Sequence, residues 1–373
     1  MAKLTFFPIG NADCCRLDLE NGQKILFDYA DTRDSSDSSD RRIDLPTELR
    51  DDLATANRDS YDVVAFTHLD KDHFARASEF FYLKHAKKYQ NEDRTHINEL
   101  WVPAAIIVEE GPDDEEARVI QAEARYRLEK GESVRVFSRP EALKDWLEDH
   151  GLTVEERKHL ITDAGQLVPG FTTSDNGVEF FVHSPFASRL DDGTLVERNR
   201  ESIVVQARFT CGGSETKVIL SSDVDHEALT YIVQVTRAKG NESRLEWDVF
   251  KLPHHCSYLS LAPEKGEEKT EPVPDVKWLF EEQGHAGGIV VSTSSPIPTT
   301  DEEQPPHKQA AAYYRDLVRS LDGQFIVTME HPSVTKPDKL EIVICDGTGG
   351  ATVLKRAAPA SVIASGTRAP RAG

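Results

Sequence analysis

The chain has 373 residues, enough for one large domain or two ordinary ones, so a small fold that depends on disulfide or metal staples is excluded. No apolar run approaches the roughly 18 to 20 residues that a membrane helix needs, and we expect no membrane partner. Lys and Arg number 44 against 65 Asp and Glu, a net charge of -21. This charge repels polyanions at long range, although bound divalent metal can reverse the sign inside a cleft.

The cysteines and the first residues point to the same compartment. Five cysteines show no C-x-x-C spacing and include one adjacent pair, which is typical of reduced thiols: Cys14, Cys15, Cys211, Cys256 and Cys345. Residues 1–15 break at Pro8 and Gly10, so they lack the apolar stretch of about 7 to 15 residues found in a secretory signal. We therefore expect a cytoplasmic protein.

Short β-prone runs open the chain and predict three strands, at residues 4–7, 15–19 and 24–28. Asn21-Gly22 lies between the last two and is a strong hairpin signal. The charged stretch 31–60 is expected to be a solvated loop. The apolar run from Val63 to Phe66 predicts a buried strand, and we expect a helix over 74–88.

The apolar runs 100–102 and 104–108 predict one further strand, and two charged helices are then expected at 113–130 and 140–150. Few residues that could carry chemistry lie between 110 and 170, so this stretch is interpreted as a helical insertion or cap. The acidic run EEGPDDEE at 109–116 is interpreted as the solvated start of a helix.

Strands and helices alternate over the rest of the chain, which predicts an α/β fold. The expected strands are 178–182, 202–209, 217–220, 249–252, 288–292, 325–329 and 340–345, and the expected helices are 227–238 and 309–321. We expect one domain over residues 1–356. The Ala-, Pro- and Gly-rich tail 357–373 is expected to be disordered.

The densest group of candidate functional residues follows directly on the strand that ends at Phe66. It contains four potential metal ligands within six residues, His68, Asp70, Asp72 and His73. Such closely spaced ligands can converge on one or two cations if the backbone forms a loop, which a strand-to-helix turn provides. The alternative is a polar helix cap, in which an aspartate binds backbone amides.

Three further sites place ligand-type residues at the ends of predicted strands: His183, Asp223 and the pair His254-His255. Each residue alone is more often structural than functional. Five of the chain's 13 histidines fall at strand ends beside several aspartates, as a site for two metal ions requires.

In this order the motifs resemble the metallo-β-lactamase superfamily, and most closely the hydrolase domain of the ComEC/Rec2 competence proteins. That branch has H-x-D-x-D-H, as found at 68–73, and H-H-G-S, similar to His254-His255-Cys256-Ser257. Its N-x-x-S matches Asn199 to Ser202, and its late S-x-x-N and G-H-P are similar to Ser292–Ser295 and His307. The resemblance covers about residues 3–350 and implies an αββα four-layer sandwich, here without the membrane channel of those proteins.

The resemblance also implies a ligand set for two divalent metal ions, Zn²⁺ or Mn²⁺. One metal would be held by His68, Asp70 and His183, and the second by Asp72, His73 and either His254 or His255. Asp223 would bridge the two ions, since a carboxylate between them offsets their repulsion and leaves room for a bridging hydroxide. Asp28 would orient ligands without binding metal.

Catalytic roles follow from the same resemblance. Asp72 belongs to the reacting centre, and His307 and the spare histidine, with His254 favoured, would touch a phosphate oxygen or protonate the leaving group. Two departures bear on the local backbone: Cys256 stands where the family has Gly, and Ser222 precedes Asp223 in place of Gly.

Three functions remain open at this point. The favoured one is a metal-dependent hydrolase of phosphodiesters that acts on nucleic acid, DNA especially, through a metal-bridged hydroxide. The second is a hydrolase of small nucleotides or phosphodiesters, and the third a non-catalytic metal-binding module. Stand-alone members of this branch occur in bacterial antiphage defence, so a regulatory protein partner is expected. A nuclease would show a positive strip beside the metal cleft, and a small-molecule enzyme a closed pocket under residues 110–170.

Overall fold

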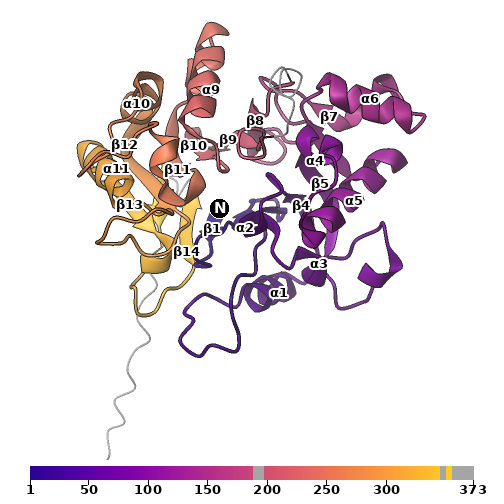
Figure 1. Ribbon diagram of the computed structural model, residues 1–373, viewed down its shortest axis with the longest axis horizontal. Helices are drawn as coiled ribbons and strands as arrows, with labels where there is room; N and C mark the ends of the chain where they lie inside the picture. Colours follow the sequence, from indigo (N-terminus) through magenta and orange to yellow (C-terminus); the bar gives the residue numbers. More distant parts are fainter. Residues whose placement is uncertain (188–196, 345–349, 355–373) are drawn as a thin grey trace, which may run out of the picture.

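A computed structural model describes residues 1–187, 197–344 and 350–354 (Figure 1). The expected disordered tail, 357–373, lies outside the described residues. In the described part, no helix combines the length and the apolar composition needed to cross a membrane.

The first sheet has nine strands among the described residues, in the order β15-β14-β1-β2-β3-β4-β5-β6-β7. Pairing is antiparallel from β15 to β3 and parallel from β3 to β7. The strands are β1 (Ala2–Phe6), β2 (Cys15–Asp18), β3 (Lys24–Phe27), β4 (Ser60–Ala65), β5 (His96–Pro103), β6 (Val134–Phe137), β7 (Ile161–Thr162), β14 (Leu340–Ile344) and β15 (Ala351–Val353).

The second sheet has six strands among the described residues, in the order β13-β12-β11-β10-β9-β8. Strands β10 to β13 are parallel, and β8 and β9 are joined to them by antiparallel pairing. The strands are β8 (Val178–Ser184), β9 (Val204–Cys211), β10 (Ser214–Leu220), β11 (Trp247–Lys251), β12 (Gly284–Ser292) and β13 (Gln324–Val327).

Two groups of helices cover the outer faces of the two sheets (Figure 1). The helices on the side of the first sheet are α1 (Leu45–Thr55), α2 (Lys71–Phe74), α3 (Ala77–Phe80), α4 (Ala104–Val108), α5 (Glu115–Lys130), α6 (Glu141–Asp149) and α7 (Val154–Arg157). Those on the side of the second sheet are α9 (His226–Ala238), α10 (Pro274–Glu281) and α11 (Lys308–Ser320). Short 3₁₀ turns lie at Lys87–Tyr89, Lys158–Leu160, Glu242–Arg244, His254–Cys256, Tyr258–Ser260 and Thr328–Glu330.

The buried side chains confirm the predicted αββα sandwich. One core lies between the sheets, and each sheet has a second core beneath its own helices. In β4, Val63 and Ala65 belong to the core between the sheets, while Val64 packs under the helices. Because both faces of such a strand are buried, its sequence is a continuous apolar run, as β11 shows again with Val249 and Phe250 on opposite faces.

The stretch 31–60 is not only a solvated loop, because it contains helix α1. The Asp44 side chain accepts a hydrogen bond from the amide of Thr47 and caps this helix. Leu45, Leu49 and Leu53 recur every four residues and pack into the core under the first sheet. The high charge of the remaining positions concealed this narrow apolar stripe.

The helix predicted over 74–88 is wrong, since this range contains only the last residue of α2, the short helix α3 and the start of the 3₁₀ turn Lys87–Tyr89. Ala75 has an extended backbone (ψ 124°), and Arg76 is left-handed (φ 58°), so the helix is broken after Phe74. Residues 104–108 form helix α4 where a strand was expected, because β5 ends at Pro103 and the apolar side chains then pack under α5 and α6.

The segment 110–170 extends the first sheet at one edge. Its helices α5 and α6 lie where they were expected, and strands β6 and β7, which were not predicted, continue the parallel pairing of β5. Ile120, Leu128 and Leu147 of its helices belong to the core under that sheet. The division of the chain into one domain with an insertion remains a prediction.

Candidate metal centre

The ends of four parallel strands bring the candidate residues together at one edge of the sandwich. Asp28 follows β3 and His68 follows the neighbouring β4, while Asp223 follows β10 and His254-His255 follow the neighbouring β11. Since the carboxyl ends of parallel strands meet at the same edge of a sheet, each sheet delivers its polar side chains to one place.

Four of the predicted ligands form one compact group: Asp72, His73, Asp223 and His255. One ligand atom of each lies within 4.8 Å of the others. Oδ2 of Asp223 is 3.5 Å from Nε2 of His73 and 3.5 Å from Nε2 of His255. Oδ2 of Asp72 is 2.9 Å from Nε2 of His255. A single carboxylate oxygen of Asp223 therefore faces two imidazoles from different sheets.

The second nitrogen of each of these imidazoles is held by the protein. Nδ1 of His255 donates to the backbone carbonyl of Thr293 at 2.7 Å, so Nε2 is the ring nitrogen left to bind a metal once it gives up its proton. Nδ1 of His73 is 2.8 Å from Oδ2 of Asp28, which places Asp28 in the orienting position predicted for it. Histidine ligands of metals show this second hydrogen bond, which fixes the tautomer.

His68 is held in the same way. Its Nδ1 lies 3.0 Å from Oγ of Ser222 and 3.2 Å from Oγ1 of Thr67. Nε2 of His68 and Nε2 of His73 are buried and have no hydrogen-bond partner among the described residues. A buried polar atom without a partner is costly, and a cation placed between these nitrogens and the carboxylates would satisfy both, so the residues present fit a divalent metal.

The electrostatics of the group also favour positive charge. Burial alone would lower the pKa of His73, but Asp28 and Asp223 raise it well above its ordinary value, and Asp223 and Asp72 likewise outweigh burial and raise the pKa of His255. Burial would raise the pKa of Asp72 and Asp223, yet the facing imidazoles lower both. The carboxylates thus hold protons on the histidines, at the atoms that a metal would take.

Asp70 lies beside this group but not in it. Its Oδ2 is 3.6 Å from Nε2 of His68, and its Oδ1 accepts a hydrogen bond of 3.1 Å from Nη1 of Arg198. The same guanidinium binds both oxygens of Glu109. The structure thus brings His68 and Asp70 to each other, as the first predicted metal requires, and adds an arginine that the sequence did not indicate.

His183 is not brought to the centre, and this part of the predicted ligand set is wrong. Its Nε2 lies 2.8 Å from the carbonyl of Arg244, and its Nδ1 lies 3.4 Å from Oγ1 of Thr236 on α9. Burial lowers its pKa to about 4. The position of β8 explains this difference, because β8 is the outermost strand of its sheet and is separated from β10 by β9.

His307 is bound by the backbone on both sides of its ring. Nδ1 accepts a hydrogen bond from the amide of Tyr258 at 3.3 Å, and Nε2 donates to the carbonyl of Glu303 at 3.2 Å. Burial lowers its pKa. With both nitrogens engaged, His307 is not available here as the proton donor that was predicted, and it holds two loops together.

His254 and its two successors have a left-handed backbone, with φ of 49°, 52° and 65° for His254, His255 and Cys256. This conformation is costly for residues other than glycine and tends to occur at functional sites. It turns the amide of His254 toward Oδ1 of Asp223, at 3.2 Å. Cys256, where the related motif has Gly, adopts the conformation a glycine would allow.

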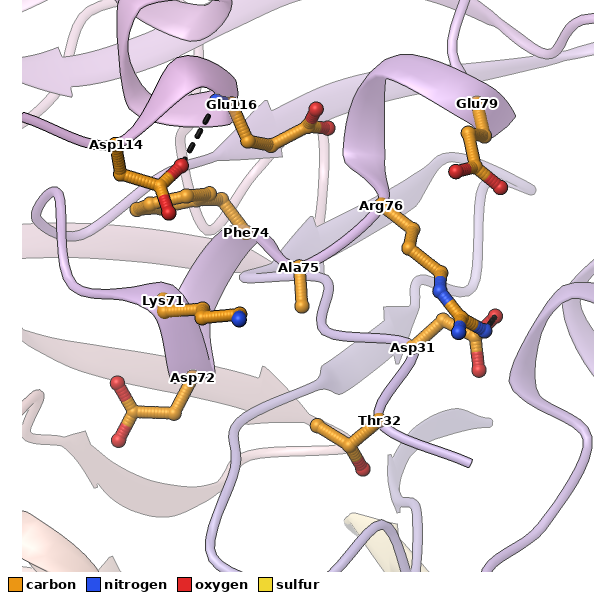
Figure 2. A pocket seen from close by; sticks show the side chains of 10 residues that line it. All are labelled: Asp31, Thr32, Lys71, Asp72, Phe74, Ala75, Arg76, Glu79, Asp114 and Glu116. Carbon is orange, nitrogen blue, oxygen red and sulfur yellow. Dashed lines mark hydrogen bonds and ion pairs between the residues drawn. The ribbon is translucent and has the colours of Figure 1, made fainter. Parts of the chain in front are cut away.

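Two clefts flank the centre. The first, of about 620 Å³, lies beside Asp72 and contains Lys71, Arg76 and five carboxylates (Figure 2). The second, of about 660 Å³, lies beside Asp223 and His254 and contains Arg198, Arg200 and six carboxylates. The acidic run 109–116 supplies carboxylates to both clefts and caps α5 through Asp114, so it is more than the solvated helix start that was expected.

Two buried residues at the centre were not singled out in the sequence. Asp13 follows the first strand and Lys251 ends β11, and the two form an ion pair directly behind Asp223. A signal was present for the lysine, because a charge inside the apolar run Val249 to Leu252 requires a buried partner. Asp13 carried no comparable signal.

No model of a known protein family matches the chain, and no curated protein matches it. Similar solved structures include a diphosphatase of the PhnP family, with a TM-score of 0.36, 10% identity, and coverage of 92% of this chain and 98% of that one. Unliganded yeast PDE1 has a TM-score of 0.42 and 11% identity, with coverage of 87% of this chain and 97% of that one. The class B3 di-zinc metallo-β-lactamase LRA-12 from an Alaskan soil metagenome has a TM-score of 0.30 and 9% identity, with coverage of 85% of this chain and 91% of that one. All three scores are low, so what the site can do is judged from its own residues.

Proposed function

We propose that the protein is a metal-dependent hydrolase of phosphodiester bonds. The observation that carries this proposal is the single oxygen of Asp223 between two imidazoles, each with its other nitrogen held by the protein. When bound, two divalent cations would supply Lewis acidity and an activated water for attack on phosphorus.

In this proposal the chain divides its ligands between two positions. Asp72, His73 and His255 would hold one cation, His68 and Asp70 would hold the other, and Asp223 would be available to both. His254 lines the second cleft, and burial lowers its pKa, so its neutral ring can accept a hydrogen bond from substrate or solvent. The nitrogen ligands suit Zn²⁺, while the aspartate-rich set also suits Mn²⁺.

The charge of the two clefts favours a small phosphodiester over a nucleic acid. Each cleft contains two cationic side chains against five or six carboxylates, so neither offers the positive strip that a nuclease would need. A substrate with one or two phosphates can bind at the cations of the centre without a basic track. DNA, which the resemblance to ComEC/Rec2 favours, is therefore the second candidate.

Three finer proposals rest on the sequence resemblance: nearness to the ComEC/Rec2 branch, a role in bacterial antiphage defence, and control by a protein partner. A cytoplasmic location is proposed as well. The free thiols of Cys14, Cys15 and Cys256 support a reducing compartment.

The experiment that tests the function compares substrates and metals directly. Metal-free protein is reloaded with Zn²⁺, Mn²⁺ or Mg²⁺ and assayed on bis(p-nitrophenyl) phosphate, linear and cyclic dinucleotides, linear and circular DNA, and RNA. We expect metal-dependent hydrolysis of the small diesters. Asp72→Ala and Asp223→Ala should each lower the rate of hydrolysis by more than the roughly 10- to 100-fold that is typical when a residue hydrogen-bonded to a metal ligand is lost.

Asp145→Ala provides the matched control, since Asp145 is an exposed carboxylate on α6, outside both clefts. It should keep full activity. Cleavage of DNA with no turnover of small diesters would exchange the order of the two candidates. Protein that binds two ions and hydrolyses none of these substrates would contradict the proposal.

A further inference from the structure

A lysine is buried behind the candidate metal centre. Lys251, at the end of β11, is 5% exposed. Its ammonium forms an ion pair with Oδ2 of Asp13 and lies 3.4 Å from the carbonyl of Ser222 and 3.9 Å from Oδ1 of Asp223. Burying an unpaired ammonium costs several kcal/mol, so the charge of Lys251 must be offset by its neighbours.

The partner of this lysine belongs to a second group of potential ligands. Asp13, Asp28 and His73 offer one atom each within 4.8 Å, and Oδ2 of Asp13 is 3.7 Å from Nδ1 of His73. The amide of Asp13 also donates to the carbonyl of Asp72 at 2.9 Å, which ties it to the ligand loop. The ammonium of Lys251 pairs with Asp13, so this second group already has a positive charge that the protein itself supplies.

The two oxygens of Asp223 have different surroundings. Oδ2 faces the imidazoles of His73 and His255, both at 3.5 Å. Oδ1 faces the amide of His254 and the ammonium of Lys251. A free carboxylate can chelate one cation with both oxygens, but here Oδ1 accepts a hydrogen bond from the amide of His254 at 3.2 Å and lies at ion-pair distance, 3.9 Å, from the ammonium of Lys251. Oδ2 is therefore the oxygen that would be available to metal beside His73 and His255.

We propose that Lys251 is a positioning residue: as a fixed internal counter-ion paired with Asp13, it restrains Oδ1 of Asp223 and leaves Oδ2 to face the histidines that would hold metal. The inference rests on the proposed metal centre and adds a residue that touches neither metal nor substrate. It separates an inner layer, where the protein supplies the positive charge, from an outer layer, which takes divalent metal.

The test removes both charges of the pair together. Asp13→Asn with Lys251→Met leaves no buried charge unpaired, and such neutral replacements of buried ion pairs are often tolerated, so we expect the double variant to fold. Its affinity for Zn²⁺, measured by calorimetry on metal-free protein, should fall about 10- to 100-fold, as when other outer partners of metal ligands are lost. The visible spectrum of the Co²⁺-loaded form should change as well.

The matched control removes another buried ion pair, Glu123 with Arg127 on α5, where each residue is 1% exposed. Glu123→Gln with Arg127→Met should leave the Zn²⁺ affinity and the Co²⁺ spectrum unchanged. The single variant Asp13→Asn is a second route if the double variant does not fold. There Lys251 loses the carboxylate that fixes its ammonium, so Oδ1 of Asp223 is no longer restrained and the affinity for Zn²⁺ should again fall.

The results separate this inference from the proposed function. Zn²⁺ affinities within twofold of the wild type, with unchanged Co²⁺ spectra, in whichever of the two Asp13 variants folds would overturn the role of Lys251. Wild-type protein that binds two ions without hydrolysing any diester would defeat the function alone, and the variants would still decide the role of Lys251. Wild-type protein that binds no metal would overturn both.

Discussion

The chemistry of the centre depends on which ring nitrogen of each histidine is free. In His255 a backbone carbonyl accepts the hydrogen bond from Nδ1, and in His73 the carboxylate of Asp28 has this role. The backbone amide of Thr67 donates a hydrogen bond of 2.7 Å to Asp28, and the hydroxyl of Thr67 donates a second one of 2.8 Å. The imidazole of His73 is therefore oriented by a carboxylate that cannot turn away.

Asp28→Asn is the residue-scale test of that orientation. An amide can still accept from Nδ1 of His73, but it loses the charge that makes the imidazole a stronger ligand. We expect the affinity for Zn²⁺ to fall about 10- to 100-fold while the protein stays folded. Calorimetry on metal-free protein measures the affinity, and far-UV circular dichroism checks the fold. An affinity equal to that of the wild type would show that Asp28 supports only the backbone of Thr67.

Single residues also show the limit of motif reading. Asp72, His73, Asp223 and His255 could be found because each follows a strand that the apolar runs reveal. His183 follows the apolar run 178–182 equally well, yet in the structure it lies within β8 and faces α9, because the order of strands in a sheet is not visible in the sequence. The choice between His254 and His255 also needed the structure, since it depends on a left-handed backbone that directs only His255 at Asp72.

At the scale of elements, continuous apolar runs and long amphipathic helices were predictable, and elements with a weaker apolar pattern were not. The buried strands β4, β8 and β11 and the helices α9 and α11 lie where the apolar pattern places them. The expected helix over 74–88 does not form because tertiary packing around Phe74 and Phe80 overrides local propensity. Helix α1 was missed because only three leucines of its eleven residues are apolar and buried.

Those three leucines provide a test of the element. Leu49 of α1 is fully buried under the first sheet, so Leu49→Ala should lower the free energy of unfolding by about 2 to 5 kcal/mol. Urea unfolding followed by circular dichroism measures the change. Asp51→Ala on the exposed side of the same helix should stay within about 0.5 kcal/mol. Equal small effects in both variants would mean that α1 contributes little to the core.

At the scale of the whole molecule, the centre exists only because two sheets meet. His68, Asp72 and His73 come from the first sheet and its following turn, whereas Asp223 and His255 come from the second. The net charge of -21 is also found at the site, since carboxylates outnumber cationic side chains in both clefts. Composition alone shows this charge but not where it lies, and its place in the clefts supports the proposal of a small substrate.

The pKa shifts predict how the stability of the metal-free protein depends on pH. The pKa values of His73 and His255 are raised in the folded state, so their stabilising effect is complete below the unfolded pKa of about 6.5 and is lost as pH rises through the folded values. Asp72 and Asp223 have lowered pKa values, so their effect is present above the unfolded pKa of about 3.9 and is lost as pH falls through the folded values. Metal-free protein should be most stable between these limits.

Metal changes this profile, because a divalent cation must displace the protons of His73 and His255. Displacement becomes easier as pH rises, so the gain in melting temperature from Zn²⁺ should grow from pH 6 to pH 8. The measurement is thermal unfolding at several pH values in that window, with Zn²⁺ and with a chelator. In Asp223→Asn the raised pKa values lose one of their causes, so the gain should be smaller and depend less on pH. A gain that is constant or shrinks with pH in the wild type would mean that metal does not replace these protons.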